Sequence, residues 1–134
     1  MHLEDILIKL EKQRKRKTES VWIATLSDNK ELLNIHNIGY KNRPDGCTYN
    51  EDKIFELLQQ DKSNKLIFIH NHPAGDKYCF PSSLDIESTK DLIKRCKKNK
   101  VELVEHIIFT KTKHCSVFKY MNNHKRTIVI TKIA

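Results

Sequence analysis

Four consecutive apolar residues, Leu66 to Ile69, constrain the fold of this chain more than any other segment. A short apolar run of this kind fits a strand that is buried on both faces, so other elements must cover both of its sides. Helices are predicted on either side of it in the sequence, where Asn50 can cap residues 51–60 and where Ile86 and Ile93 share one stripe of residues 82–99. The sequence therefore predicts the α/β class, with a central mixed sheet flanked by helices.

The remaining elements follow from apolar periodicity and from turn residues. Helices are expected over 2–17, 51–60 and 82–99, and strands over 20–27, 31–38, 65–70, 101–109, 114–120 and 126–132. The stretches 39–49 and 71–81 contain glycine and proline and are expected to be loops. No linker divides the chain, so we expect one domain over residues 1–134 with the order α-β-β-α-β-α-β-β-β.

Composition excludes several classes of protein. No apolar run approaches the roughly 20 residues that cross a bilayer. Glu4, Asp5 and Glu11 interrupt the segment where a secretory signal would be apolar. The four cysteines form no C-x-x-C pair and are too few for a disulfide scaffold. We therefore expect a cytoplasmic protein with reduced thiols and no membrane contact.

The chain is basic, with 25 lysine and arginine residues against 17 aspartate and glutamate residues and a net charge of +8. Many of these basic residues lie in two runs, 12–17 and 94–100. Such runs are typical of solvated helix faces, and they also fit a docking surface for nucleic acid or for an acidic protein. Neither run contains the aromatic residues that single-strand binding favours.

The segment 69–85 carries the residues that indicate chemistry. His70 and His72 alternate at the end of a predicted strand, so both imidazoles can face one point. Asp85 lies in the first turn of the next predicted helix, where the chain returns from the loop. Two neutral histidines and one carboxylate suit Zn²⁺ and leave its fourth position open, which is typical of a catalytic zinc site. Zinc in such a site lowers the pKa of the water that it holds and polarises a carbonyl oxygen.

A hydrolytic site of this kind also needs a base and a donor to the oxyanion. Glu19 is the candidate base, because it immediately precedes the predicted strand 20–27. Ser82 is the candidate oxyanion donor at the start of the predicted helix. Taken alone, Ser82 and Asp85 are explained by helix capping, and Glu19 by an exposed surface position. Glu31 and Glu51 stay open as alternative bases.

These residues resemble the JAMM motif of the MPN/JAB-domain metalloproteases. The sequence pattern is closest to that of the RadC-like branch, which is HNHPSGD, then PS, then D. The matching residues here are His70-Asn71-His72-Pro73-Ala74-Gly75-Asp76, then Pro81-Ser82, then Asp85. Residues 19–26 and 103–108 resemble two further strands of that family. In all, roughly residues 1–120 can be aligned with a JAB domain.

The resemblance implies a JAB/MPN fold with the layered architecture of cytidine deaminases. It implies His70, His72 and Asp85 as ligands of Zn²⁺, Glu19 as general acid and base, and Ser82 as oxyanion donor. The implied activity is that of a zinc metalloprotease or isopeptidase acting on a protein or peptide, including ubiquitin-like modifiers. The alternative is a RadC-like protein that acts in DNA metabolism or on mobile elements and binds nucleic acid.

The chain departs from the RadC-like pattern at two places. The loop between His72 and Asp85 is two residues longer than usual, around 77–80, and Gly39-Tyr40 only loosely matches a Gly-Thr pair. Cys79 lies in the longer loop, and a contact with zinc is an alternative to its being an ordinary loop residue. His106 is expected to be either a packed residue or a hydrogen-bond partner of a metal ligand.

Overall fold

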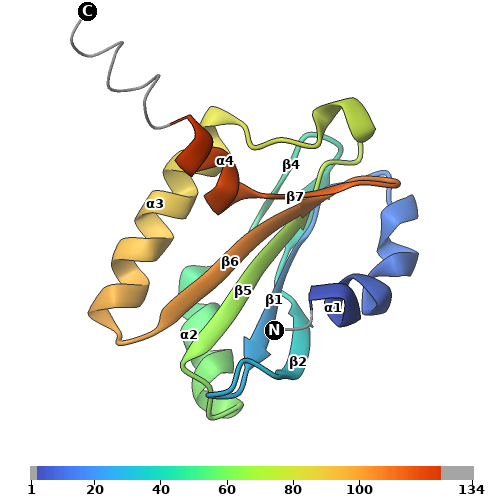
Figure 1. The fold of residues 1–134 in the computed structure, drawn as a ribbon. Coiled ribbons are helices and arrows are strands. Elements are labelled where there is room, and N and C mark those ends of the chain that lie inside the picture. The colour runs from blue at the N-terminus through green and yellow to red at the C-terminus, as the bar shows by residue number, and fades with distance from the viewer. Residues whose placement is uncertain (1–2, 125–134) are drawn as a thin grey trace, which may run out of the picture.

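Residues 3–124 are described by a computed structural model, whose centre is a five-stranded mixed sheet (Figure 1). Its strand order is β2-β1-β5-β6-β7. The strands are β1 (Val21–Leu26), β2 (Leu32–Asn37), β5 (Lys65–Asn71), β6 (Glu102–Phe109) and β7 (His114–Ser116). β5 and β6 are parallel, whereas the other neighbours are antiparallel. The apolar run that dominates the sequence thus forms the central strand, and its residues 66–71 are all buried.

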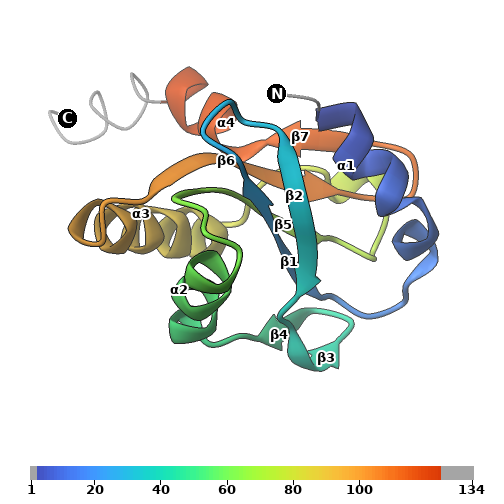
Figure 2. The ribbon, with the colours of Figure 1, turned by 90° about the horizontal axis from the view of Figure 1, so that it is seen from below.

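Helices cover both faces of this sheet, as the apolar strand requires (Figure 2). On one face, α2 (Glu51–Gln60) and α3 (Ser83–Lys98) pack against Leu66 and Phe68 of β5. On the other face, α1 (Leu3–Lys9) packs against Ile67 and Ile69. The predicted fold class, a mixed sheet flanked by helices, is confirmed. None of the described helices combines the length and the apolar character that crossing a membrane requires.

Local signals in the sequence explain where the two large helices begin. The side chain of Asn50 accepts a hydrogen bond from the backbone N–H of Asp52 at the start of α2. Ser82 and Asp85 form a reciprocal capping box at the start of α3. This capping box fixes the first turn of α3 beside the end of β5, which is the end of the sheet where the candidate site lies.

Four segments differ from the sequence prediction. The helix predicted over 2–17 ends at Lys9 and is followed by a 3₁₀ turn, η1 (Glu11–Lys15), because residues 11–17 offer no apolar side chain to bury. The loop predicted over 39–49 contains a hairpin of β3 (Tyr40–Arg43) and β4 (Gly46–Thr48). The loop predicted over 71–81 contains the short 3₁₀ turn η2 (Asp76–Tyr78).

The strand predicted over 114–120 is also wrong in its second half. Only β7 is extended, and α4 (Val117–Asn123) follows it. The Ser116 hydroxyl accepts a hydrogen bond from the backbone N–H of Lys119 and caps this helix, which buries Val117. The strand predicted over 126–132 lies outside the described residues.

Candidate metal centre

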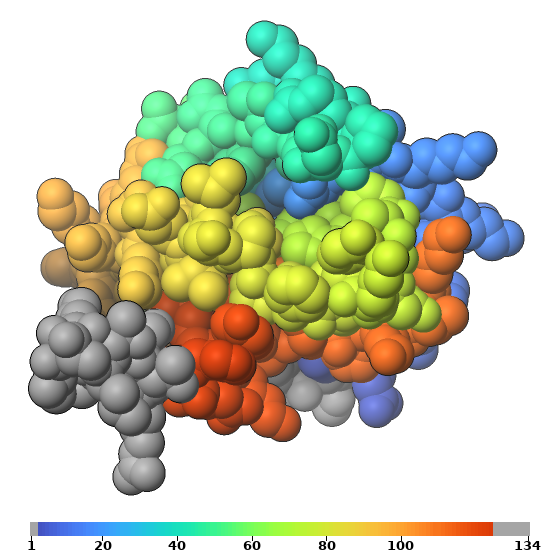
Figure 3. All heavy atoms as spheres, turned by 90° about the horizontal axis from the view of Figure 1, so that it is seen from above, coloured from blue at the N-terminus to red at the C-terminus, as the bar shows by residue number. Residues whose placement is uncertain are grey.

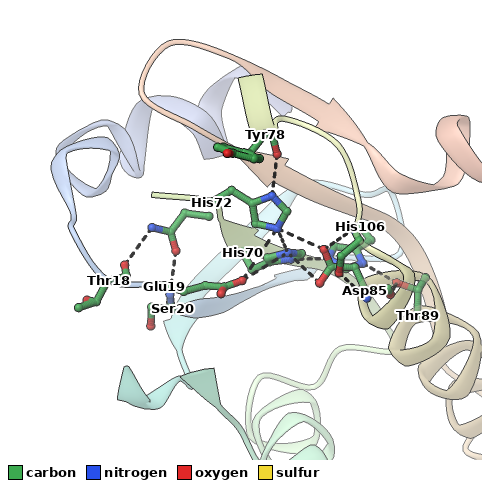
Figure 4. A network of polar contacts seen from close by, with 11 residues as sticks. Thr18, Glu19, Ser20, His70, His72, Tyr78, Asp85, Thr89 and His106 are labelled. Atoms are coloured by element: carbon green, nitrogen blue, oxygen red, sulfur yellow. Dashed lines mark hydrogen bonds and ion pairs between the residues drawn. The ribbon is translucent and has the colours of Figure 1, made fainter. Parts of the chain in front are cut away.

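Side chains from β5, α3 and the segment before β1 converge at one end of the sheet (Figure 4). The Nε2 atoms of His70 and His72 lie 3.0 Å apart. The two carboxylate oxygens of Asp85 lie 3.3 Å from His70 Nε2 and 3.2 Å from His72 Nε2. Glu19 Oε1 lies further out, at 3.8 Å from His70 Nε2 and 4.0 Å from His72 Nε2. The four side chains that the sequence singled out as ligands and base are therefore brought together.

The capping box of α3 holds Asp85 in this position. The backbone N–H of Ser82 donates to Asp85 Oδ2 at 2.9 Å, and the backbone N–H of Asp85 donates to Ser82 Oγ at 3.1 Å. Ser82 and Asp85 therefore cap α3 and also lie in the candidate site. Because Ser82 Oγ accepts this bond with a lone pair, the hydroxyl hydrogen stays available to donate to another group.

Asn71 holds the segment that carries Glu19, a role that the sequence analysis missed. Its Oδ1 accepts from the backbone N–H of Ser20 at 2.7 Å, and its Nδ2 donates to the backbone carbonyl of Thr18 at 3.1 Å. The backbone N–H of Glu19 itself donates to the carbonyl of Arg43 at 2.7 Å. Alternation shows only that an asparagine between two alternating histidines faces away from them, so the sequence alone did not signal its bonds to Thr18 and Ser20.

A chain of hydrogen bonds fixes the tautomer of His70. Thr89 Oγ1 lies 2.6 Å from the carbonyl oxygen of Asp85, which can only accept, so the threonine hydroxyl donates there. Thr89 Oγ1 must then accept from His106 Nδ1 at 2.7 Å. His106 Nε2 consequently carries a lone pair and accepts from His70 Nδ1 at 2.8 Å. His70 is left with its Nε2 lone pair directed at the site.

A single hydrogen bond sets the tautomer of His72. Its Nδ1 lies 2.7 Å from the backbone carbonyl of Tyr78 and must donate to it, which leaves the Nε2 lone pair facing that of His70. When both rings are neutral, two nitrogen lone pairs and two carboxylate oxygens thus face one another. Such a set repels itself unless a proton or a metal cation lies among its members, and nitrogen and oxygen donors of this kind suit Zn²⁺. The residues therefore fit the metal ion that the resemblance implies.

The electrostatics of the site favour positive charge between these groups. Burial disfavours the Asp85 carboxylate, but the adjacent imidazoles of His70 and His72 outweigh it and hold its pKa well below the usual range. Burial also opposes the charged form of His72, yet the contacts with Asp85 and the Tyr78 carbonyl raise its pKa. Burial lowers the pKa of His106 well below its usual value and keeps that ring neutral, as the hydrogen-bond chain requires.

Glu19 has the properties of a proton acceptor beside this group. Burial raises the pKa of its carboxyl, and the neighbouring histidines offset only part of that rise. The two alternative bases lie elsewhere. Glu51 accepts a hydrogen bond from Arg95 at 3.1 Å, and Glu31 lies beside α1 at the other end of β1.

A cleft of about 480 Å³ gives access to the site. One wall is the β3–β4 hairpin, and the other is the start of α3 with the loop that follows β5. Figure 3 shows the surface hollowed between these walls, where the cyan hairpin faces the yellow start of α3. Ser82 lines the cleft together with the two histidines and Asp85.

Cys79 points away from this cleft. Its sulfur lies 3.9 Å from the backbone carbonyl of Ile108, and its thiol lies against that of Cys115 on β7. Within residues 3–124, the cluster of histidine, cysteine and acidic groups that could hold a metal ion contains Glu19, His70 and His72 and no cysteine.

Comparison with known proteins adds an independent finding. Residues 3–124 match a family described as "RadC-like JAB domain". Relatives are UPF0758 proteins from several bacteria. The one from Alkaliphilus metalliredigens is 32% identical over 99 residues, which cover 74% of this chain and 41% of that protein. The one from Staphylococcus haemolyticus is 27% identical over 100 residues, which cover 75% of this chain and 43% of that protein. The chain thus spans less than half the length of these relatives.

Proposed function

Because the chain belongs to the RadC-like JAB family, we propose that it is a zinc-dependent metallohydrolase of the JAMM type that cleaves a peptide or isopeptide bond. The observation that carries this proposal is the convergence of four atoms that can bind a metal ion, the Nε2 atoms of His70 and His72 and the two carboxylate oxygens of Asp85. Such an arrangement attracts a cation, and the cleft leads substrate directly to it.

His70 Nε2, His72 Nε2 and the Asp85 carboxylate would hold the metal ion. Zinc bound there would polarise the scissile carbonyl and make a water molecule acidic enough to attack at neutral pH. The protein contributes the fixed orientation of the ligands. Thr89 and His106 set the tautomer of His70, and the Tyr78 carbonyl sets that of His72.

Glu19 is the proposed general acid and base. Its Oε1 lies 3.8–4.0 Å from the two imidazole nitrogens, which is too far for a hydrogen bond, so neither ring occupies this oxygen. The carboxylate would take a proton from the attacking water and pass it to the leaving amine. Burial supports both steps, because it raises the pKa of Glu19 towards the value at which a carboxyl both accepts and returns a proton.

Ser82 is the proposed donor to the oxyanion. Its oxygen accepts from the backbone of Asp85, so its hydrogen is free to bind the negative oxygen that forms during attack. The β3–β4 hairpin offers a place for substrate backbone, since both strands of a two-stranded sheet are edges. An extended peptide can pair with such an edge, and Gly46 and Cys47 of β4 line the cleft.

Metal analysis and hydrolysis test the proposal together. We expect the dialysed protein to retain one zinc ion per chain and Asp85→Ala to lose it. We expect hydrolysis of a ubiquitin-like modifier fused to a reporter, with no turnover in Glu19→Gln although its zinc content stays unchanged. A protein that binds no zinc, or a Glu19→Gln variant that retains turnover, would contradict the assignment.

A further inference from the structure

A basic groove lies beside the cleft. It has a volume of about 260 Å³, and its charged lining residues are Lys15, Arg16, Lys17 and Lys111. The first three follow one another at the end of η1, whereas Lys111 lies in the turn between β6 and β7. Among the described residues, no carboxylate lines this groove.

Arg14 holds the two basic segments against each other. Its Nη1 donates to the backbone carbonyl of Thr110 at 2.8 Å and to that of Lys113 at 3.2 Å. Its side chain is 13% exposed, and its Nε pairs with Glu11 at 3.0 Å. Arg14 is therefore occupied as a clamp, and it brings Lys111 beside the 15–17 segment despite the repulsion between like charges.

The groove cations have no carboxylate of their own. Among residues 3–124, none of the four forms an ion pair. Two acidic residues beside these segments are already engaged. Glu11 pairs with Arg14, and Asp76 accepts hydrogen bonds from Thr110 and Thr112. A concentration of positive charge without internal compensation attracts an anionic ligand.

The basic groove and the cleft are continuous. Pro44, Pro73 and Ala74 line both of them, and Lys17 precedes Glu19 by two residues. A polypeptide that lies in the cleft with its scissile bond over Glu19 would extend into the basic groove on one side of that bond.

Resting on the proposed hydrolase function, we propose that the substrate is a polypeptide with acidic side chains on one side of the scissile bond, and that the basic groove binds them. A nucleic acid fits less well. Within residues 3–124, the groove lining contains no aromatic side chain on which a base could stack, and the groove continues into the cleft that we propose for peptide.

Binding of a simple acidic probe tests this inference. The probe is a fluorescein-labelled peptide of ten glutamates, and its binding to the Glu19→Gln protein is followed by fluorescence anisotropy at low and high salt. The triple variant Lys15→Gln, Lys17→Gln, Lys111→Gln should bind the probe roughly tenfold more weakly at low salt, because three exposed ion pairs are lost. Lys94→Gln, Lys97→Gln, Lys98→Gln removes the same charge from exposed positions on α3 and should change affinity less than about twofold.

Continuity with the cleft is tested by a photo-crosslinker, benzoylphenylalanine, at either end of the probe. One of the two peptides should crosslink to residues 43–49 or 82–88, which flank the cleft. The inference is overturned if the probe fails to bind at low salt, if both triple variants lose affinity equally, or if neither peptide crosslinks there. Tighter binding of a twenty-nucleotide oligothymidine, lost in the groove variant, would assign the groove to nucleic acid instead. All of these measurements are independent of turnover, so the hydrolase proposal can fail separately.

Discussion

The hydroxyl of Thr89 can be removed without changing the shape of the site, and we expect Thr89→Val to weaken zinc binding by 10- to 100-fold. Thr89 is 1% exposed, and its Oγ1 is the acceptor for His106 Nδ1 at 2.7 Å. Without it, the buried Nδ1–H of His106 lacks a partner, which costs about 1–3 kcal/mol. The cost is avoided if the proton moves to His106 Nε2, but that nitrogen then no longer accepts from His70 Nδ1. His70 must in turn carry its proton on Nε2, where it blocks the metal.

The expected loss corresponds to about 1.4–2.7 kcal/mol, which is also the usual effect of removing a residue that orients a metal ligand. Zinc affinity is measured by competition with a chromophoric chelator. Nitrogen-15 NMR of the imidazoles reads the tautomers of His70 and His106 directly in the metal-free protein. A circular dichroism spectrum shows that the variant is folded.

Thr89→Ser is the matched control, because it keeps the hydroxyl and loses only a methyl group. It should retain zinc affinity within about threefold. The reasoning is refuted if Thr89→Val binds zinc as the unmodified protein does, if Thr89→Ser loses as much affinity, or if the metal-free NMR spectrum shows a proton on His70 Nε2 in the unmodified protein.

Three further predictions concern the other supports of the site and the core. Ser82→Ala should lower kcat by roughly 100-fold in a turnover assay and stability by about 1 kcal/mol in thermal unfolding. Ser82→Thr keeps the hydroxyl and should retain most of the activity and most of the stability. Asn71→Ala should cost about 2–3 kcal/mol in denaturant unfolding, because it removes the buried bond to Ser20 and the partly buried bond to Thr18 that flank Glu19. If Asn71→Ala were as stable as the unmodified protein, the role of Asn71 in holding the Glu19 segment would be contradicted. Asp61→Asn should destabilise the protein by about 1–2 kcal/mol at pH 7. Burial opposes the Asp61 carboxylate, but hydrogen bonds from His36 and Thr25 lower its pKa. A lowered pKa contributes stability above about pH 4. The difference in the free energy of unfolding between the unmodified protein and Asp61→Asn should therefore shrink as the pH falls through the Asp61 pKa of the folded protein.

Sequence patterns predicted correctly those features that depend only on residues close to one another in the chain. The apolar run of β5, the cap of α3 and the alternation of His70 and His72 each depend on neighbours in the sequence, and each element lies where the pattern predicted it. α4 shows the limit of such patterns. Val117 is buried and Ser116 caps the helix, so residues 114–120 satisfy a strand and a helix pattern equally until tertiary packing selects one.

The β3–β4 hairpin was hidden for a different reason. Its residues are intermediate or exposed, so they show no apolar alternation, and the glycine and proline content of 39–49 is equally typical of a loop. The hairpin is tied to the rest of the fold by contacts distant in the sequence, among them the bond from the backbone N–H of Glu19 to the carbonyl of Arg43 and the packing of Cys47 against the core. No pattern within residues 39–49 reports that bond.

The position of His106 depends on an irregularity that alternation alone would have misread. Leu103 packs on the α2–α3 face of the sheet and Val104 on the α1 face, so strict alternation places residue 106 on the α1 face. The register between β5 and β6 shifts after Leu66, and this shift reverses the facing of the residues that follow. Ile107 and Phe109 therefore lie on the α1 face, and His106 meets Thr89 of α3.

The side chain of Glu105 stabilises this irregularity. Its Oε1 accepts from the backbone N–H of His106 at 2.9 Å and from the Ser116 hydroxyl at 2.9 Å. The backbone group at the bulge is thereby satisfied without a partner strand. A single extra residue in β6, held by one carboxylate, is thus what turns a buried histidine into the group that sets the tautomer of His70. The geometry of the candidate metal site depends on the register of the sheet as much as on the motif itself.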